Sequence, residues 1–388
     1  MGESYLVIGG SGFLGRNIVE GLLARGDKNV SVLDVVQRFH DVTFYPGDIT
    51  NEVDVGNAIQ KSGATCIFHT VAPNVVGGST RDLFYRINVL GTKTVLACAA
   101  AYGVPKVVYT SSAGNVYNQT DLIDIDERLT VPENQRDAYN ATKAEAEALV
   151  LAANGQDGLH TVALRPAGIF GLANVIKNNQ TRIQIGSNCN MFDWLYVDNC
   201  VKAHLLAADK LLNPPIDPSA LTRSLPSITL STGKYTIPTS DARPPGPALE
   251  IAPEVEERYF AFQEGIQDKS CVRSKFDPLT EAALELEPTY PLQVAGQAFF
   301  ITNGEPMYIW DFFRAMWKEL GHKNEKWVIA VPNALGLVLG TLSEWYSSLR
   351  GREPGRRVLG YEPEVGIEEG IKRTCAWWIA EQAQSQKT

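Results

Sequence analysis

The first half of the chain alternates short apolar runs with segments in which apolar residues recur at helical spacing. An apolar run with few charges is typical of a strand that helices cover on both sides. This alternation predicts an α/β fold with a doubly wound parallel sheet. The expected strands are Tyr5–Gly9, Val30–Asp34, Thr65–Val71, Lys106–Ser111 and His160–Arg165, and the expected helices are Leu14–Arg25, Ile87–Tyr102 and Ala138–Ala153.

The pattern changes after Leu212. Nine prolines lie between Pro214 and Pro253, and such a segment cannot maintain a regular ladder of backbone hydrogen bonds. We expect a partly disordered surface insertion here. Ordered structure should return near Gly296–Thr302, with a helix at Ile309–Leu320.

The most apolar stretch of the chain is Val328–Leu342. As a helix it would be about 23 Å long, which is shorter than the roughly 30 Å hydrocarbon layer of a membrane. Proline and glycine residues within it weaken it further as a membrane span. Two interpretations stay open: a buried helix of a small lobe, or an element at a membrane surface.

Composition narrows the function by exclusion. The formal net charge of −9 argues against a nucleic-acid backbone as the main partner. Neither the cysteines nor the histidines occur at metal-binding spacing, so we expect reduced thiols and no metal site. We expect no secretory signal, because the first apolar run leads into a glycine-rich turn, and Leu6 stands where a myristoylation signal needs serine or threonine.

That glycine-rich turn follows the first expected strand and opens the first expected helix. Gly9 permits a tight turn, Gly12 lets the backbone approach a pyrophosphate, and Gly15 allows close helix packing. The phosphates then lie at a helix N-terminus, where free N–H groups favour negative charge. Phe13 and Leu14 complete the expected contacts. This context predicts a dinucleotide site in a Rossmann-type fold.

Asp34 indicates which dinucleotide binds. It ends the second expected strand, 19 residues after Gly15. A carboxylate there accepts hydrogen bonds from the adenosine ribose and repels a 2′-phosphate. Val35 and Val36 follow, where an NADP enzyme would carry an arginine, so NAD is the expected cofactor. Arg38 is near enough in sequence to keep NADP as the less favoured alternative.

Three residues form the expected catalytic group. Tyr139 and Lys143 lie four residues apart, on one face of an expected helix. Free tyrosine, with a pKa near 10, is a poor base, and we expect Lys143 and the nicotinamide ring to lower the pKa of Tyr139. Ser112 directly follows the expected strand Lys106–Ser111. It therefore lies at the carboxyl edge of the sheet, where Ser112 would hold the substrate oxygen. The group predicts hydride removal from a secondary alcohol.

These features predict that the chain is organised in three parts. Residues 1–212 form a NAD-binding domain, of which 161–205 also contribute to the substrate pocket. Residues 213–295 are the insertion, and 296–388 form a smaller C-terminal substrate lobe, for which a position facing a membrane stays open.

The motifs together resemble the 3β-hydroxysteroid dehydrogenase group of the extended short-chain dehydrogenases. The glycine spacing and the Tyr139/Lys143 pair are specific for the chemistry, whereas the other segments support membership alone. The resemblance covers most of the chain outside the insertion. The segments that carry it are Ile8–Gly15, Leu83–Asn88, Arg165–Gly171, Phe192–Val197 and Ala298–Asn303.

The resemblance implies further cofactor contacts. Asp48 would lie by the adenine, the run from His69 to Ala72 would line the nicotinamide side, and Asn88 would brace the central strands. Tyr139 and Lys143 are expected to contact the cofactor as well, Lys143 by donating to the nicotinamide ribose. The additional cofactor residues that the resemblance implies are Asp48, Ile49, Thr70, Ala72, Asn88 and Pro166.

Within the group, the likeness is closest to members that act on 3β-hydroxy-4α-carboxysterols. It implies oxidation of the 3β-hydroxyl with NAD and loss of the C4 carboxylate as CO₂. Ser112 and Tyr139 would hydrogen-bond the enolate oxygen in the second step. The likeness also implies attachment to the cytosolic face of the endoplasmic reticulum membrane, with other sterol C4-demethylation enzymes as partners. A cytoplasmic location is the alternative.

Other functions stay open because the chain departs from the group's pattern in three segments. Leu172–Ile185 is short, a piece near Arg352–Arg356 is missing, and Pro214–Pro291 is inserted. One alternative is oxidation of another 3β-hydroxysteroid, a triterpenoid or another natural-product alcohol without decarboxylation. A nucleotide-sugar epimerase or dehydratase is a second, although Gly168 stands where those enzymes usually carry asparagine. A third is a NAD-binding protein without catalysis.

Overall fold

The computed structural model describes residues 2–73, 79–117, 131–132, 135, 137–170, 183–185, 188, 191–213, 293–321, 329–331 and 364–385. Most of the predicted insertion therefore lies outside the described residues. So do the missing piece near Arg352–Arg356 and most of the short segment at Leu172–Ile185.

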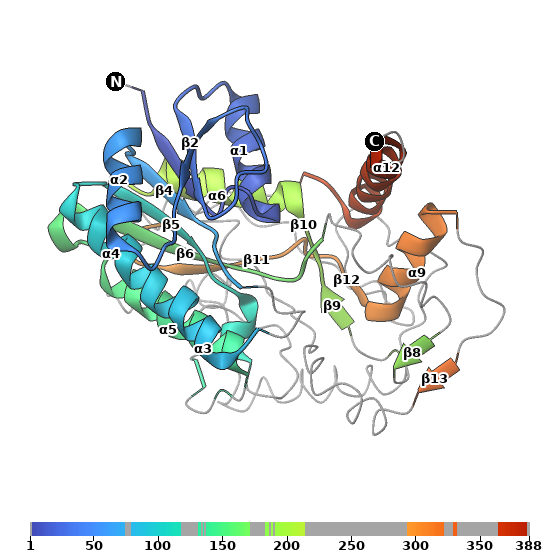
Figure 1. The fold of residues 1–388 in the computed structure, drawn as a ribbon. Helices are drawn as coiled ribbons and strands as arrows, with labels where there is room; N and C mark the ends of the chain where they lie inside the picture. Colours follow the sequence, from blue (N-terminus) through green and yellow to red (C-terminus); the bar gives the residue numbers. More distant parts are fainter. Residues whose placement is uncertain are drawn as a thin grey trace, which may run out of the picture.

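A seven-stranded sheet forms the centre of the molecule, with the order β11-β6-β5-β4-β1-β2-β3 (Figure 1). Every neighbouring pair in it is parallel. Its strands are β1 (Tyr5–Ile8), β2 (Val30–Asp34), β3 (Thr43–Pro46), β4 (Cys66–His69), β5 (Lys106–Thr110), β6 (His160–Pro166) and β11 (Ala298–Ile301). This topology confirms the predicted doubly wound, Rossmann-type fold.

Helices cover both faces of this sheet and bury two separate apolar clusters. On one face, α1 (Phe13–Arg25) packs against α6 (Val197–Lys210). On the other face, α2 (Glu52–Ser62), α4 (Thr92–Ala101) and α5 (Ala138–Ala152) pack in sequence. Both faces of the central strands are therefore dry, which explains their continuous apolar runs.

Short helical segments connect several of these elements. α3 (Arg81–Phe84) continues into the π-helical η1 (Tyr85–Gly91) and then into α4. The helix predicted at 87–102 is therefore π-helical over its first five residues, 87–91. The 3₁₀ helices η2 (Ala113–Val116) and η3 (Gln156–Gly158) follow β5 and α5.

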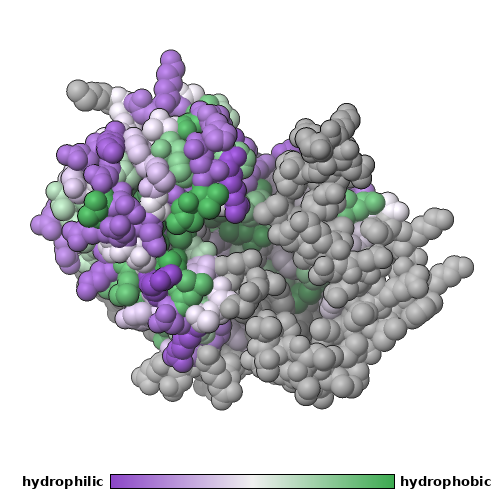
Figure 2. Space-filling view, viewed as in Figure 1, coloured by the Kyte–Doolittle hydropathy of each residue, from purple (hydrophilic) through white to green (hydrophobic). Residues whose placement is uncertain are grey.

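The remaining elements lie beyond the carboxyl edge of the sheet (Figure 1). β9 (Met191–Asp193) pairs with β12 (Pro306–Tyr308), β10 (Leu195–Tyr196) with β7 (Ile169–Phe170), and β8 (Ile183–Ile185) with β13 (Ile329–Val331). α9 (Ile309–Glu319) confirms the predicted helix there and contacts α12 (Ile367–Ser385). Figure 2 shows polar residues over much of the outer face and hydrophobic residues near the central hollow.

Two expectations from the sequence need correction. Residues 298–301, which we assigned to the C-terminal lobe, form β11 of the main sheet, paired with β6. Ile329–Val331 is a strand, so the helix predicted from Val328 is wrong at these residues; residues 332–342 lie outside the described residues. Among the helices that the structure describes, none is long and apolar enough to span a membrane.

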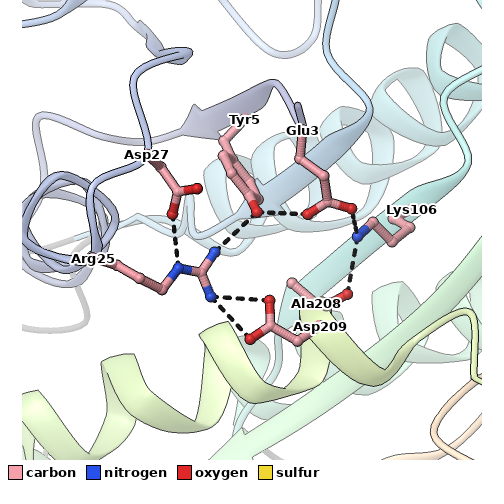
Figure 3. Close-up of polar contacts among 7 residues, drawn as sticks. All are labelled: Glu3, Tyr5, Arg25, Asp27, Lys106, Ala208 and Asp209. Carbon is pink, nitrogen blue, oxygen red and sulfur yellow. Dashed lines mark hydrogen bonds and ion pairs between the residues drawn. The ribbon is translucent and has the colours of Figure 1, made fainter. Parts of the chain in front are cut away.

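A polar network joins the elements at the amino edge of the sheet (Figure 3). The Arg25 guanidinium donates to Asp27, to Asp209 and to the Tyr5 hydroxyl, and that hydroxyl donates to Glu3. The Lys106 ammonium donates to Glu3 and to the carbonyl of Ala208. We call this set, Glu3, Tyr5, Arg25, Asp27, Lys106, Ala208 and Asp209, the amino-edge network. It ties the start of two strands to the ends of α1 and α6.

Candidate active site

The glycine turn has the geometry that a dinucleotide site needs. Gly9 has a φ of +87°, a region that favours glycine. A Cβ at Gly15 would lie 2.2 Å from the Gly9 carbonyl oxygen, so two backbone segments cross there without space for a side chain. At Gly12, a Cβ would meet only that oxygen, at 3.2 Å. The space around Gly12 is otherwise open, so a ligand can approach the backbone there.

The first turn of α1 is open to an anion. The helix follows Gly12, which provides no side-chain cap, and no acidic residue stands in its first turn. The N–H groups at this end are therefore available to phosphate oxygens. The residues present fit the pyrophosphate of a dinucleotide.

Asp34 lies beside this turn, as the sequence predicted. One of its carboxylate oxygens accepts a hydrogen bond from the Ser11 N–H at 3.0 Å, and the other from the Val35 N–H at 2.8 Å. Arg38 donates to the Ser11 carbonyl at 3.4 Å. The carboxylate and the guanidinium thus flank the same loop. Arg38 is close enough to be relevant to the choice between NAD and NADP.

The other expected cofactor residues lie at the same carboxyl edge. Asp48 accepts hydrogen bonds from the Thr50 N–H and hydroxyl, both at 2.8 Å, and Ile49 is buried against Gly91. Thr70 donates to the Ile8 carbonyl at 2.9 Å and borders Gly9. Two more residues follow strands at this edge: Ala72, which is exposed, and Pro166, which ends β6.

The structure places Asn88 on a helix, next to another helix. It sits in the π-helical η1, and its amide donates to the Thr142 hydroxyl of α5 at 3.0 Å. A role in bracing the central strands stays a prediction. The contact joins two helices, and π-helical turns are frequent near functional sites.

The structure brings the three expected catalytic residues together. α5 begins after Asp137, whose carboxylate accepts hydrogen bonds from the Tyr139 and Asn140 N–H groups. This cap places Tyr139 in the first turn and Lys143 one turn later. Ser112, at the start of η2, hydrogen-bonds the Tyr139 side chain. Ser112 also accepts from the Gly114 N–H at 3.1 Å, which fixes the turn that carries it.

The pKa of Tyr139 differs from the prediction. Burial, together with the charge of Asp137, raises the pKa of Tyr139 to about 12, although the hydrogen bond with Ser112 opposes this. The expected lowering by Lys143 is therefore wrong for the chain by itself. The reason is geometric: the Lys143 ammonium donates to the Thr110 carbonyl at 2.7 Å and lies 4.6 Å from the centre of the Tyr109 ring.

Lys143 is almost completely buried. Burial lowers its pKa to about 7, while the negative charge of Glu147 acts in the opposite direction. His69 is enclosed beside it, and burial together with the charge of Lys143 lowers the pKa of this imidazole to about 3. His69 is therefore neutral at neutral pH. Its Nε2 lies 2.9 Å from the Thr92 hydroxyl.

Sequence reasoning missed a buried network next to these residues. The Glu147 carboxylate accepts hydrogen bonds from Arg165, Ser111 and Asn115. We call Ser111, Asn115, Glu147 and Arg165 the carboxyl-edge network. The sequence held one indication of this network. At four-residue intervals, α5 carries Tyr139, Lys143 and Glu147, on a helix otherwise rich in alanine and leucine.

Gly168 has a structural reason to lack a side chain. A Cβ there would lie 2.6 Å from Cε1 of Phe192 and 3.3 Å from Trp194. The Trp194 ring in turn stacks on Phe312 of α9 at 4.0 Å. An aromatic cluster thus occupies the place where a sugar-binding asparagine would project. Within the described residues, no group of three or more potential metal ligands comes together.

Comparison with known proteins agrees with this chemistry. The model of the 3-beta hydroxysteroid dehydrogenase/isomerase family matches residues 6–223 and 281–331. The chain is 34% identical to sterol-4-alpha-carboxylate 3-dehydrogenase, decarboxylating, of Saccharomyces cerevisiae, over 97% of both chains. It is 32% identical to the Schizosaccharomyces pombe protein of the same name, over 98% of both chains.

Solved structures agree on the fold. UDP-glucose 4-epimerase of Thermus thermophilus, in complex with NAD, has a TM-score of 0.62 and 20% identity, covering 96% of this chain and 98% of its own. A short-chain dehydrogenase/reductase superfamily protein of Agrobacterium tumefaciens with bound NAD has a TM-score of 0.64 and 16% identity over the whole of both chains. At these identities the likeness shows the fold alone.

Proposed function

The chain belongs to the 3-beta hydroxysteroid dehydrogenase/isomerase family, and on that premise we propose that it oxidises the 3β-hydroxyl of a 4α-carboxysterol with NAD and releases the C4 carboxylate as CO₂. The observation that carries the proposal is the end-to-end likeness to decarboxylating sterol dehydrogenases. The hydrogen-bonded Ser112 and Tyr139, with Lys143 on the same helix face, supply the chemistry.

In the oxidation, NAD held by the glycine turn and Asp34 would supply the acceptor for the hydride of the carbinol carbon. Tyr139 takes the hydroxyl proton, and Ser112 donates a hydrogen bond to the oxygen as it becomes a carbonyl. Because the pKa of Tyr139 is about 12 in the chain alone, the phenol needs a nearby positive charge to act as a base. Lys143 donates to the Thr110 carbonyl in the chain alone and does not supply that charge to Tyr139 there; a bound nicotinamide ring would supply it.

In the decarboxylation, the 3-ketone makes the product a β-keto acid. The bond between C4 and the carboxylate breaks, CO₂ leaves, and the electron pair forms an enolate at the C3 oxygen. Ser112 and the reprotonated Tyr139 already surround that oxygen. Two donors at a developing oxyanion are the arrangement that stabilises such a step.

The proposal includes a location and partners. Sterols reside in membranes, and we place the protein on the cytosolic face of the endoplasmic reticulum membrane, with other sterol C4-demethylation enzymes as its partners. The names of the two yeast relatives support the sterol substrate. The membrane and the partner enzymes follow from the pathway that this substrate implies, and a cytoplasmic location is the alternative.

The aromatic cluster at Gly168 argues against a nucleotide-sugar substrate, even though epimerases share the fold. Phe192 leaves no space for an asparagine at residue 168. Because Phe192, Trp194 and Phe312 are packed in the buried core, residue 168 offers no polar group to a sugar.

The test is to incubate the purified protein with NAD and a 4α-carboxysterol and to measure NADH and CO₂ together. Equal amounts of both are expected. NADH without CO₂ would identify a dehydrogenase that does not decarboxylate, acting on a steroid, a triterpenoid or another alcohol. Epimerisation of a UDP-sugar with no NADH would favour the epimerase alternative, and NAD binding without any turnover would identify a non-catalytic protein.

A further inference from the structure

The carboxylate of Glu147 lies where three elements meet. Its Oε1 accepts a hydrogen bond from Nη2 of Arg165 on β6 at 2.5 Å. Its Oε2 accepts from the Ser111 hydroxyl at 2.5 Å and from the Asn115 amide at 3.2 Å. The Glu147 and Arg165 side chains are 3% and 6% exposed, so water contributes little to holding this charge.

Two of these contacts reach the turn that carries Ser112. Ser111 precedes it directly, and Asn115 lies on the helix η2 that it starts. The Asn115 amide also donates to the Ser111 hydroxyl at 2.8 Å. The turn is therefore attached to the same carboxylate on both sides of Ser112.

The same carboxylate belongs to the helix that presents Tyr139 and Lys143. The three residues recur every four positions along α5, so Glu147 lies on the same side of the helix, two turns from Tyr139. Through Glu147, the turn that holds the substrate oxygen is joined to the helix that removes its proton.

We propose that Glu147 is a positioning residue of this active site: held by Arg165, its carboxylate fixes the Ser112 turn at hydrogen-bonding distance from Tyr139 on α5. This inference rests on the proposed alcohol oxidation, in which both residues act on one oxygen. It goes beyond it by assigning a role to four residues outside the catalytic group.

A plain structural ion pair would not need the two extra contacts. Arg165 donates from both Nε and Nη2 and already satisfies much of the carboxylate. A buried ion pair contributes little net stability by itself, because desolvation offsets the attraction. The hydrogen bonds from Ser111 and Asn115 are the ones that orient the turn, so removing them tests position without breaking the ion pair.

The experiment compares Ser111→Ala, Glu147→Gln and the double variant. Ser31→Ala is the matched control, because the buried Ser31 hydroxyl also donates a hydrogen bond, to the Tyr5 carbonyl at 3.2 Å, far from Glu147. Each variant is measured for kcat, for the KM of NAD, and for its thermal unfolding midpoint. Crystal structures give the distance between the Ser112 and Tyr139 oxygens.

A displaced reacting group can lower the rate by about a hundredfold per ångström, so kcat should fall roughly 10- to 100-fold in Glu147→Gln and less in Ser111→Ala. The KM of NAD should change less than twofold, and Ser31→Ala should keep the wild-type kcat. The double variant should be no slower than Glu147→Gln, because both changes break the same connection. In the variant crystals, the Ser112–Tyr139 distance should exceed hydrogen-bonding range.

The inference is overturned if Ser111→Ala keeps the wild-type kcat and Ser112–Tyr139 distance, or if Ser31→Ala loses as much activity. Ser111→Ala retains the ion pair, so it also provides the test if Glu147→Gln fails to fold. A wild-type protein that does not oxidise the sterol acid would refute the proposed function instead. In that case the crystallographic distance still decides the role of Glu147.

Discussion

The amino-edge and carboxyl-edge networks lie at opposite edges of one sheet, and they differ in their access to water. At the amino edge, Arg25 and Asp209 are 32% and 46% exposed. At the carboxyl edge, Glu147 and Arg165 are almost completely enclosed. Exposed ion pairs add little stability, since water solvates either partner when the other is lost. An enclosed pair leaves an unsolvated charge if it is broken.

The two networks also differ in the structural elements that each one connects. The amino-edge network joins the ends of elements that the two apolar clusters already pack together. The carboxyl-edge network joins the Ser112 turn to the helix that carries Tyr139. Damage at the first edge should therefore affect stability, and damage at the second should affect catalysis.

The largest expected effect is at the carboxyl edge. Tyr139→Phe removes the proposed base, and kcat should fall by roughly 10²- to 10⁴-fold, while the affinity for NAD should change less than twofold. NADH absorbance gives the rate, and isothermal titration gives the affinity. Turnover equal to that of the wild type would remove Tyr139 from the mechanism.

Acidification should destabilise the fold through two histidines at the same edge. Burial lowers the pKa of His69 to about 3 and that of His204 to about 4. Below the ordinary pKa of 6.5 the unfolded chain binds protons that the folded chain does not, so stability falls as the pH falls. The free energy of unfolding should decrease between pH 6.5 and 5 by up to about 1.4 kcal/mol per pH unit for each histidine.

Urea unfolding at several pH values measures this slope. His204→Gln, which removes one of the two titrating groups, should reduce the slope by about half. A slope that His204→Gln leaves unchanged would exclude His204 as a source of the acid sensitivity.

At the amino edge, Lys106→Met should lower the free energy of unfolding by about 1–2 kcal/mol and leave kcat within twofold of the wild type. The change removes the hydrogen bonds to Glu3 and Ala208, but the partly exposed Glu3 can be solvated by water. Chemical denaturation and steady-state kinetics measure the two effects. A large loss of kcat without loss of stability would contradict the proposed separation of roles.

This amino-edge contribution depends on pH in its own range. Burial raises the pKa of Glu3, yet hydrogen bonds from Lys106 and Tyr5 outweigh burial and hold it below its ordinary value. The contribution is therefore present above pH 4.5 and lost as the pH falls through the folded-state pKa. The stability difference between wild type and Lys106→Met should shrink in that acid range.

The smallest effect concerns the cofactor end of the carboxyl edge. Asp34→Ala should shift the preference between NAD and NADP toward NADP by roughly tenfold, about 1.4 kcal/mol, because repulsion of the 2′-phosphate is lost and Arg38 stays nearby. Asp34→Asn is the control, since it keeps an acceptor for the Ser11 N–H. The ratio of kcat/KM for the two cofactors measures the shift, and an unchanged ratio would refute the role of Asp34.

The sequence predicted the fold well where patterns are local. β1, β2, β5, β6, α1 and α5 lie within one or two residues of their predicted bounds. β3 was missed because it is a short edge strand with exposed or half-buried residues. β11 was assigned to another part of the chain, because its neighbour β6 lies more than a hundred residues away in sequence.

The candidate site shows the same limit. The glycine turn, Asp34, Tyr139 and Lys143 follow from spacing along single elements. Glu147 and Arg165 are on different elements, 18 residues apart, and only the fold shows that they meet in a buried position. The raised pKa of Tyr139 could not be predicted from the sequence either, because it depends mainly on burial.

The crossing of Gly15 over the carbonyl of Gly9 has a consequence for protein engineering. With 2.2 Å between that oxygen and any added Cβ, no substitution at residue 15 can be accommodated without moving the backbone of the turn that we propose as the phosphate site. Libraries that aim to change cofactor use should therefore keep the turn constant and vary the segment from residue 34 to 38, where side chains such as Val35 and Val36 are free in solvent.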